Sequence, residues 1–297
     1  MLKLNRVVVP LSLDCNLHCK YCYRKAGLRE IPEFNDLMRN YLSNLQPSWC
    51  NSVTASGGEP LLHFDKVKEL FSYVPPLVHK KIMTNCVELT QEMVDYFNEM
   101  NVEVCCSHDG EMTKYLRGID ILKEPDILAL IKQLNNFYIF SVCTKFNNDP
   151  YLNYLNTSSY FDKPFNYNTL FTFEDEYLPG LMDDFDFSKY VKGYMKLRQE
   201  GIIKQDAPQL QRRKQGFNVL PDGTVVGMSK IHHTYGTIEN TMEELIQKKR
   251  ELGDFDVCES FKDCSCRDRC CQASQLASKS FCKGLQTVDA WFQSFED

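Results

Sequence analysis

Residues 6–22 read RVVVPLSLDCNLHCKYC, a short β-branched run followed at once by three cysteines. The run has the composition of a strand. Cys15, Cys19 and Cys22 lie in the loop directly after it, with the spacing C-x3-C-x2-C. Three thiolates so close together can hold one face of a metal centre and leave one metal position without a protein ligand. An open position is what a catalytic metal centre needs.

Short apolar runs alternate with amphipathic segments along most of the remaining chain. The expected strands are residues 6–13, 52–56, 81–84, 102–107, 137–143 and 169–173. The expected helices are residues 33–45, 64–73, 90–100, 126–134 and 187–199, with Thr90 as an N-cap. Such β/α alternation predicts a mostly parallel sheet with helices outside it.

The pattern changes near residue 210. Residues 216–228 predict a hairpin turned at Pro221-Asp222-Gly223, where Gly supplies a positive φ. Residues 241–252 predict one further helix, and periodicity returns only at residues 288–295. We therefore expect two domains, residues 1–210 and residues 211–297.

The composition excludes several classes of protein. Of the 297 residues, 43% are hydrophobic and 25% are charged, as in a soluble globular protein that can bury a core without disulfides. The net charge of -6 disfavours a nucleic-acid substrate, because phosphate binding requires a basic face. No run approaches the roughly 18 to 20 apolar residues that a membrane span requires.

The chain contains 14 cysteines, most of them in two clusters. It opens without a convincing export signal, so a reducing, cytoplasmic setting with thiolates as metal ligands is expected. Five cysteines outside the clusters lie in or beside expected strands, where free Cys commonly serves as a small buried hydrophobe. They are Cys50, Cys86, Cys105, Cys106 and Cys143. Cys86 could instead face a pocket.

The first cluster resembles the motif of the radical SAM enzymes. The resemblance implies a partial (β/α)6 TIM-like barrel in which three Cys bind a 4Fe-4S cluster. The fourth iron then chelates the amino and carboxylate groups of S-adenosylmethionine (SAM). Tyr21, before the third Cys, matches an aromatic residue that approaches the adenine. A zinc knuckle completed by His18 or a distant residue is the alternative.

Further motifs resemble the same family, and each ends an expected strand. Ser56-Gly57-Gly58-Glu59-Pro60 resembles the GGEP motif that receives the methionine amino group. Thr84-Asn85 and Ser107-His108-Asp109-Gly110, with Arg117 following, resemble segments associated with the SAM carboxylate, the ribose and the edge of the substrate pocket. Carboxyl ends of parallel strands form the rim on which α/β folds build active sites. The resemblance therefore implies a SAM site at Tyr21, Gly57, Gly58, Glu59, Thr84, Asn85, Ser107, Asp109 and Arg117.

The second cysteine cluster resembles the SPASM and twitch extensions, which bind auxiliary iron-sulfur clusters in enzymes that modify peptides and proteins. Its cysteines are Cys258, Cys264, Cys266, Cys270, Cys271 and Cys282. Met228 stands where the full extension has a Cys, and no Cys lies between Cys143 and Cys258, so two ligands of one cluster are missing. We expect one auxiliary 4Fe-4S cluster on Cys266, Cys270 and Cys282, with Cys264 or Cys258 as the fourth ligand. Zinc on the same thiolates is the alternative.

The resemblance implies a reductive reaction in which SAM is cleaved to a 5'-deoxyadenosyl radical that abstracts hydrogen from the substrate. A peptide or protein side chain is the expected substrate, and a reducing partner such as flavodoxin or ferredoxin is expected. No further catalytic residue is assigned. The alternatives are modification of a small metabolite or nucleotide and a non-catalytic iron-sulfur module that senses redox state.

Overall fold

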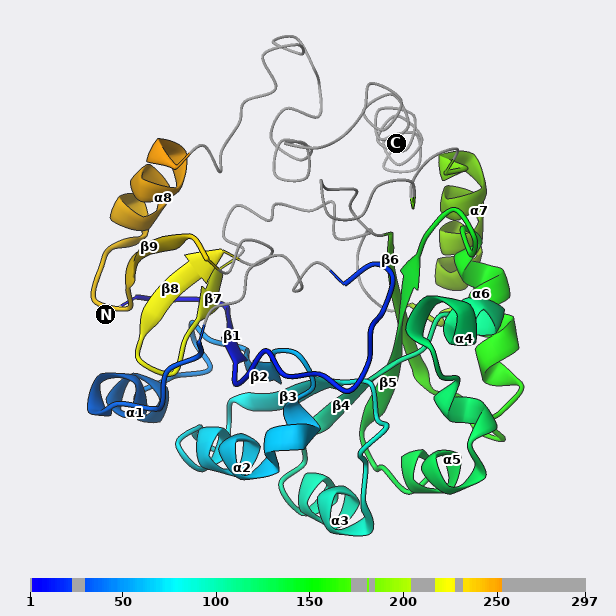
Figure 1. Ribbon diagram of the computed structural model, residues 1–297, viewed down its shortest axis with the longest axis horizontal. Coiled ribbons are helices and arrows are strands. Elements are labelled where there is room, and N and C mark those ends of the chain that lie inside the picture. Colours follow the sequence, from blue (N-terminus) through cyan, green and yellow to red (C-terminus); the bar gives the residue numbers. More distant parts are fainter. Residues whose placement is uncertain are drawn as a thin grey trace, which may run out of the picture.

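The computed structural model describes residues 2–22, 30–171, 181, 185–203, 217–227 and 232–252. Within them, six parallel strands follow one another in chain order and curve into an open sheet (Figure 1). They are β1 (Arg6–Pro10), β2 (Ser52–Ser56), β3 (His79–Thr84), β4 (Glu103–Ser107), β5 (Phe137–Cys143) and β6 (Asn166–Phe171). In this part of the chain β1 and β6 do not pair. The expected partial (β/α)6 barrel is confirmed.

Helices connect the strands and cover the convex side of the sheet (Figure 1). They are α1 (Asp36–Ser43), α2 (Phe64–Ser72), α3 (Gln91–Glu99), α4 (Thr113–Arg117), α5 (Pro125–Ile131), α6 (Pro150–Ser158) and α7 (Phe187–Gln199). The Oγ1 atom of Thr90 accepts the Met93 N–H at 3.3 Å, which confirms the expected N-cap of α3. No helix in the described ranges is both long and apolar enough to cross a membrane.

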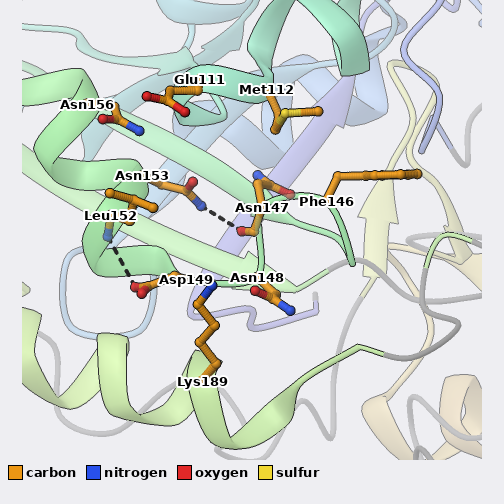
Figure 2. Close-up of a pocket in the computed structure, with 10 residues that line it drawn as sticks. All are labelled: Glu111, Met112, Phe146, Asn147, Asn148, Asp149, Leu152, Asn153, Asn156 and Lys189. Carbon is orange, nitrogen blue, oxygen red and sulfur yellow. Dashed lines mark hydrogen bonds between the residues drawn. The ribbon is translucent and has the colours of Figure 1, made fainter.

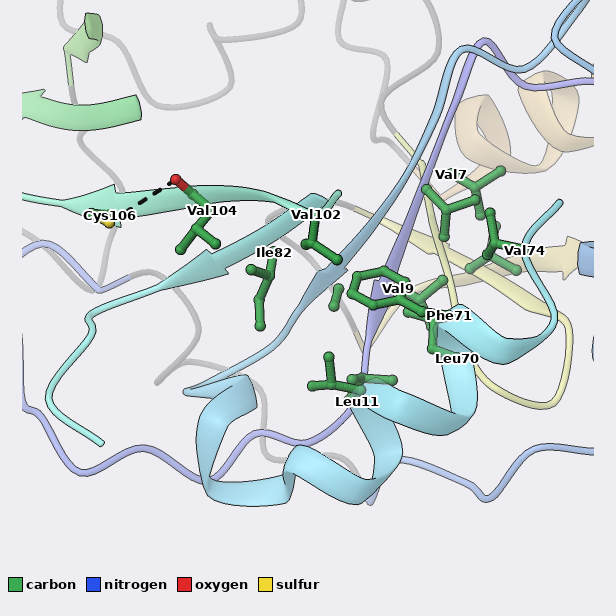
Figure 3. Close-up of a cluster of buried hydrophobic side chains, with 14 of the residues drawn as sticks. Val7, Val9, Leu11, Leu70, Phe71, Val74, Ile82, Val102, Val104 and Cys106 are labelled. Atoms are coloured by element: carbon green, nitrogen blue, oxygen red, sulfur yellow. Dashed lines mark hydrogen bonds between the residues drawn. The ribbon is translucent and has the colours of Figure 1, made fainter. Parts of the chain in front are cut away.

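The core lies between the sheet and these helices. Alternate strand residues point to the same side, so Val7 and Val9 of β1 are buried together with Ile82 and Val104. Figure 3 shows these side chains packed with Leu70 and Phe71 of α2. Each fully buried side chain of this size contributes roughly 1.5 to 3 kcal/mol. The hydrophobic pattern of the strands thus fixes which side of the sheet the helices cover.

The concave side of the sheet is more polar. The Lys81 ammonium of β3 pairs with the Glu103 carboxylate of β4, and Met83 remains 38% exposed. Asn166 and Asn168 alternate with the buried Tyr167 and Thr169 on β6, which places them on this side. A closed barrel fills the same space with branched apolar side chains. Here the inner surface offers hydrogen-bonding groups.

A small antiparallel sheet packs beside β1 (Figure 1). It consists of β7 (Phe217–Val219), β8 (Thr224–Gly227) and β9 (Thr234–Thr237), and α8 (Met242–Glu251) follows. The turn expected at Pro221 to Gly223 connects β7 to β8. Asn35, the N-cap of α1, donates its side-chain amide to the Asp222 carbonyl at 2.9 Å. The Leu2 N–H donates to the Ile238 carbonyl at 2.9 Å, and the small sheet shares the barrel's hydrophobic cluster.

The domain division stays a prediction, because residue 210 lies outside the described residues. The periodic segment at residues 288–295 and the cysteines of the second cluster lie outside them too. The five cysteines near the strands are buried and free, which confirms their role as small core side chains. Burial raises the pKa of Cys105 and Cys143 to about 12. Cys86 is buried as well, with φ of 61°.

Several elements differ from the expectation. The short helix α4 and the strand β9 were not expected, and β1 ends at Pro10 rather than at residue 13. β6 runs from Asn166 to Phe171, whereas the expected strand was residues 169–173. It therefore begins three residues earlier and ends two residues earlier than expected. Asn166 and Asn168 are polar, so the first half of this strand lacks the apolar run by which a strand is predicted.

Helix α6 was not expected, although Asp149 followed by Pro150 is a helix-start signal. Tyr154 of α6 packs against Phe165 and against Tyr167 of β6. The aromatic residues of this segment therefore do not recur at the regular spacing by which an amphipathic helix is predicted.

We predict that Asp149→Ala destabilises α6. The Asp149 carboxylate accepts the N–H groups of Tyr151 and Leu152 at 3.0 and 3.1 Å, and alanine leaves both without this partner. The free energy of unfolding should fall by about 1 kcal/mol in urea titrations. Asp162→Ala is the control, because this side chain is 96% exposed and caps no helix. Equal losses in both variants would contradict the capping role.

Candidate functional site

The motifs that follow the first four strands meet at one edge of the sheet. The loop with Cys15, Cys19 and Cys22 follows β1, and the Gly57-Gly58-Glu59 segment follows β2. Thr84 ends β3 and Ser107 ends β4. Parallel strands place their carboxyl ends on the same edge, so these segments become neighbours only in the folded sheet.

The two glycines let the turn after β2 press against the backbone that leads into the cysteine loop. A Cβ atom on Gly57 would lie 2.2 Å from the Ser12 carbonyl oxygen, and one on Gly58 would lie 2.0 Å from that of Asp14. Gly57 also has φ of 141°, a conformation that favours glycine. The Gly58 and Glu59 N–H groups donate to the same two carbonyls at 2.8 and 2.7 Å. The lack of a side chain at Gly57 and Gly58 therefore makes room for residues 12–14 of the same chain.

Glu59 joins the β2 turn to the end of β3. Its side chain is only 1% exposed. The carboxylate accepts the Leu61 N–H at 3.0 Å, the Thr84 hydroxyl at 2.7 Å and the Asn85 N–H at 2.7 Å. Burial raises the pKa of Glu59, and these three hydrogen bonds oppose the rise. A contact between Glu59 and the amino group of SAM stays a prediction. It would be a fourth hydrogen bond to this carboxylate, beside those from Leu61, Thr84 and Asn85.

Asn85 continues this connection to the cysteine loop. Its side-chain amide donates to the Asn16 side-chain oxygen at 2.8 Å and lies 3.9 Å from the Cys15 sulfur. Its own oxygen accepts the Val87 N–H at 2.9 Å. The amino end of the loop is therefore held by hydrogen bonds that run from β2 through β3.

A second buried carboxylate holds the other end of the loop. Asp109 has no exposed surface, and it accepts hydrogen bonds from the Tyr21 hydroxyl, from the Arg117 Nε at 2.7 Å and from the Val142 N–H at 2.8 Å. Burial raises the pKa of Tyr21 well above its usual value, so the phenol stays a donor. Burial is the largest influence on the pKa of Arg117 and would lower it, but Asp109 together with the neighbouring Tyr21 and Cys19 raises the pKa.

The predicted roles of Tyr21, Asp109 and Arg117 toward SAM stay predictions. In the structure the three side chains bind one another, and Arg117 lies 5.2 Å from the Tyr21 ring centroid. Ser107 ends β4 on the concave side and is half-buried. Sequence reasoning missed that Asp109 fixes Tyr21 and that Asn16 binds Asn85. The only signal was the position of the Asp-Gly pair at a strand end.

The three cysteines of the loop are free and partly exposed, unlike the buried cysteines of the core. Burial raises the pKa of the Cys15 and Cys19 thiols, which a bound cation would reverse. Among the described residues no three His, Cys, Asp or Glu side chains stand close enough to hold a single metal ion. In an iron-sulfur cluster, by contrast, each thiolate binds its own iron atom.

A small pocket lies at the same edge of the sheet, outside this set of contacts (Figure 2). It has a volume of about 90 Å³, whereas pockets for drug-sized ligands measure about 300 to 1,000 Å³. The pocket can take one side chain and is too small for a nucleoside. It is lined by Glu111, Met112, Phe146, Asn147, Asn148, Asp149, Leu152, Asn153, Asn156 and Lys189.

Residues 9–144 match the model of the radical SAM superfamily. This part of the chain is similar to the domain that defines that superfamily. Members of the family use a 4Fe-4S cluster and SAM. The residues of the domain fit these groups, because three free thiols lie in one loop whose two ends are fixed by hydrogen bonds. Cys15, Cys19 and Cys22 would hold the cluster.

Known proteins with similar sequences and folds are consistent with this domain. The chain is 29% identical over 185 residues to the cysteine-type anaerobic sulfatase-maturating enzyme of Clostridium novyi (strain NT), with 55% of this chain and 47% of that enzyme covered. The chain spans about half the length of the curated relatives it matches.

Two groups of solved structures share the fold. Native anSMEcpe with bound AdoMet and Cp18Cys peptide gives a TM-score of 0.66 at 21% identity, covering 96% of each chain. Streptococcus suis SuiB bound to precursor peptide SuiA gives a TM-score of 0.63 at 14% identity, covering 91% of this chain and 71% of that one. The likeness to both extends over residues beyond the radical SAM domain.

We predict that Gly58→Ala displaces the cysteine loop. The added Cβ would stand 2.0 Å from the Asp14 carbonyl oxygen, so backbone must move. Unfolding free energy should fall by about 1 to 3 kcal/mol, and the three loop thiols should react faster with a thiol reagent under native conditions. Gly118→Ala is the control, because its φ of 95° is strained while no atom lies within 4 Å of its Cβ position. Unchanged thiol reactivity in Gly58→Ala would contradict the prediction.

A second prediction concerns the hydrogen bonds that the buried Asp109 carboxylate accepts. Asp109→Asn leaves the buried Arg117 charge without its carboxylate, so the unfolding free energy should fall by about 3 to 5 kcal/mol. Tyr21→Phe removes one hydrogen bond and should cost about 1 kcal/mol. In the double variant the two losses should not add, with a coupling of at least about 0.5 kcal/mol. Additive losses in urea titrations would show that the two side chains do not interact.

Proposed function

We propose that this protein is a radical SAM enzyme that cleaves SAM reductively and abstracts hydrogen from a peptide or protein side chain. The observation that carries the proposal is the cysteine loop, which presents three free thiols at the carboxyl edge of a parallel sheet. When bound, the cluster and SAM supply an electron and a 5'-deoxyadenosyl radical. Every other task falls to residues of this chain.

The chain's own residues orient these groups. Glu59 and Asn85 hold one end of the loop, and Asp109 holds the other through Tyr21. The buried contacts keep the loop in place before any ligand binds, which reduces the ordering that binding requires. Ser107 and the exposed Met83 lie on the concave side, where the sheet can shield a reactive species from water.

A peptide is the substrate we favour. The concave surface carries the Lys81–Glu103 pair and two asparagines, groups that can hydrogen-bond a peptide backbone. The anSMEcpe and SuiB structures contain peptides, and the Clostridium novyi relative matures sulfatases. These relatives support the proposal by analogy of fold and of partial sequence.

We also propose one auxiliary 4Fe-4S cluster in the second cysteine cluster and a reducing protein as electron donor. The cluster would use Cys266, Cys270 and Cys282 with Cys264 or Cys258, all of which lie outside the described residues. The free cysteines in the barrel core suit a reducing compartment, which supports a cytoplasmic location.

We predict that Cys19→Ala abolishes SAM cleavage. Anaerobically reconstituted protein with dithionite should convert SAM to 5'-deoxyadenosine and methionine, measured by chromatography. Removing one of three thiolates destroys the cluster site. Cys50→Ala is the matched control, because this buried thiol lies outside the site and its loss should leave cleavage within about twofold. Cleavage that survives in Cys19→Ala would overturn the proposal.

A metal count tests the auxiliary site. Two 4Fe-4S clusters give about eight iron atoms per chain, and one gives about four. We expect about eight, falling to about four in Cys270→Ala with SAM cleavage partly kept and turnover of the peptide substrate lost. Cys143→Ala is the control for removal of a buried thiol. About four iron atoms with one zinc in the unaltered protein would instead favour the zinc site.

A further inference from the structure

Two aromatic rings stand out on the surface near the cysteine loop. Tyr115 of α4 is 46% exposed and Phe146, after β5, is 41% exposed. Among residues whose side chains the structure describes, these are the only Phe, Tyr or Trp that are exposed. Their ring centroids lie 5.1 Å apart at 70°, an edge-to-face contact. Exposed aromatic pairs of this kind are typical of protein–protein contact surfaces.

A lysine lies over each ring. The Lys20 Nζ lies 3.7 Å from the Tyr115 centroid, and the Lys145 Nζ lies 5.4 Å from the Phe146 centroid. Neither ammonium has a carboxylate partner among the ion pairs of the described residues. We call these four side chains, Lys20, Tyr115, Phe146 and Lys145, the lysine–aromatic surface. It is a cationic patch on a chain with a net charge of -6.

The acidic side chains nearby make no ion pair with Lys20 or Lys145 among the described residues. Glu111 lines the small pocket beside Phe146, and Lys189 lines the same pocket (Figure 2). Asp149 caps α6, and Asp109 is buried against Arg117. The pocket could take one side chain of a bound protein.

The surface is attached to the cysteine loop by the backbone. Lys20 lies between Cys19 and Tyr21, and its N–H donates to the Leu116 carbonyl at 2.8 Å. Tyr115 is the neighbour of Leu116 in α4. A protein seated on these side chains would therefore lie against the loop that carries the three thiols.

We propose that the lysine–aromatic surface is the docking site of an acidic protein that carries single electrons, of the flavodoxin or ferredoxin kind. The proposal rests on the proposed function, since an electron is needed only if the loop holds a cluster. The carrier loses one electron and the cluster gains one, with no bond made or broken. Opposite charge increases the rate of encounter, and the rings supply apolar contact.

The test measures binding of an oxidised bacterial flavodoxin with a net negative charge to the full chain by calorimetry, without turnover. Lys20→Glu and Lys145→Glu should each raise the dissociation constant about fivefold or more. Salt raised from about 50 to about 300 mM should weaken binding of the unaltered protein and have little effect on the double variant. Lys3→Glu and Lys163→Glu are matched controls, because both lysines are exposed and precede strands at the opposite edge of the sheet. Equal binding in variants and controls overturns the docking site.

A second measurement separates this inference from the proposed function. Dithionite needs no docking surface, so Lys145→Glu should keep dithionite-driven SAM cleavage while flavodoxin-driven cleavage at limiting carrier falls about fivefold. Lys145 is the decisive residue because it lies outside the cysteine loop. Loss of dithionite-driven cleavage in the unaltered protein would contradict the proposed function, and the binding comparison would still decide the surface. A raised KM for an acidic peptide with unchanged carrier affinity would overturn the docking site in favour of substrate binding.

Discussion

Two buried carboxylates, Glu59 and Asp109, hold a loop that belongs to no helix or strand. A buried carboxylate is costly unless donors surround it, and each of these two accepts three hydrogen bonds or more. The donors come from different strand ends and from the loop itself. Satisfying Glu59 therefore requires the ends of β2 and β3 to be in place, and satisfying Asp109 requires the loop, α4 and β5 to be in place together.

This arrangement couples the site to the fold. Glu59 connects β2 to β3, Asn85 extends the connection to the loop, and Asp109 connects the loop to α4 and β5. The site cannot form from the cysteine segment alone, because the groups that hold it are separated by many residues in the chain. The same coupling means that changes far from a thiol, at Gly58 or Asp109, act on the thiols through the loop.

The two surfaces beside the loop differ in a way that suits two kinds of partner. The concave side of the sheet offers an ion pair, asparagines and a partly exposed methionine, which suits a polar chain drawn inside an open barrel. The lysine–aromatic surface offers lysines over exposed rings, which suits an acidic protein.

The sequence by itself determined the elements that have a clean period and the motifs that end them. The β-branched runs of β2 and β5, the helix after Thr90 and the Pro221 to Gly223 turn lie where their local patterns predict. The buried cysteines follow from their positions in strands. These features depend on residues close together in the chain, whose physical preferences act locally.

Only the tertiary structure decided how the site is held and what surrounds it. The hydrogen bond from Tyr21 to Asp109 joins residues 88 positions apart, and that from Asn85 to Asn16 joins residues 69 apart. Helix α6 and the start of β6 depend on aromatic and asparagine side chains whose partners lie on other elements. The exposure of Tyr115 and Phe146 depends on how the cysteine loop, α4 and the segment after β5 lie beside one another in the folded chain. No local pattern encodes such long-range pairings, since they exist only when the sheet brings the strand ends to one edge.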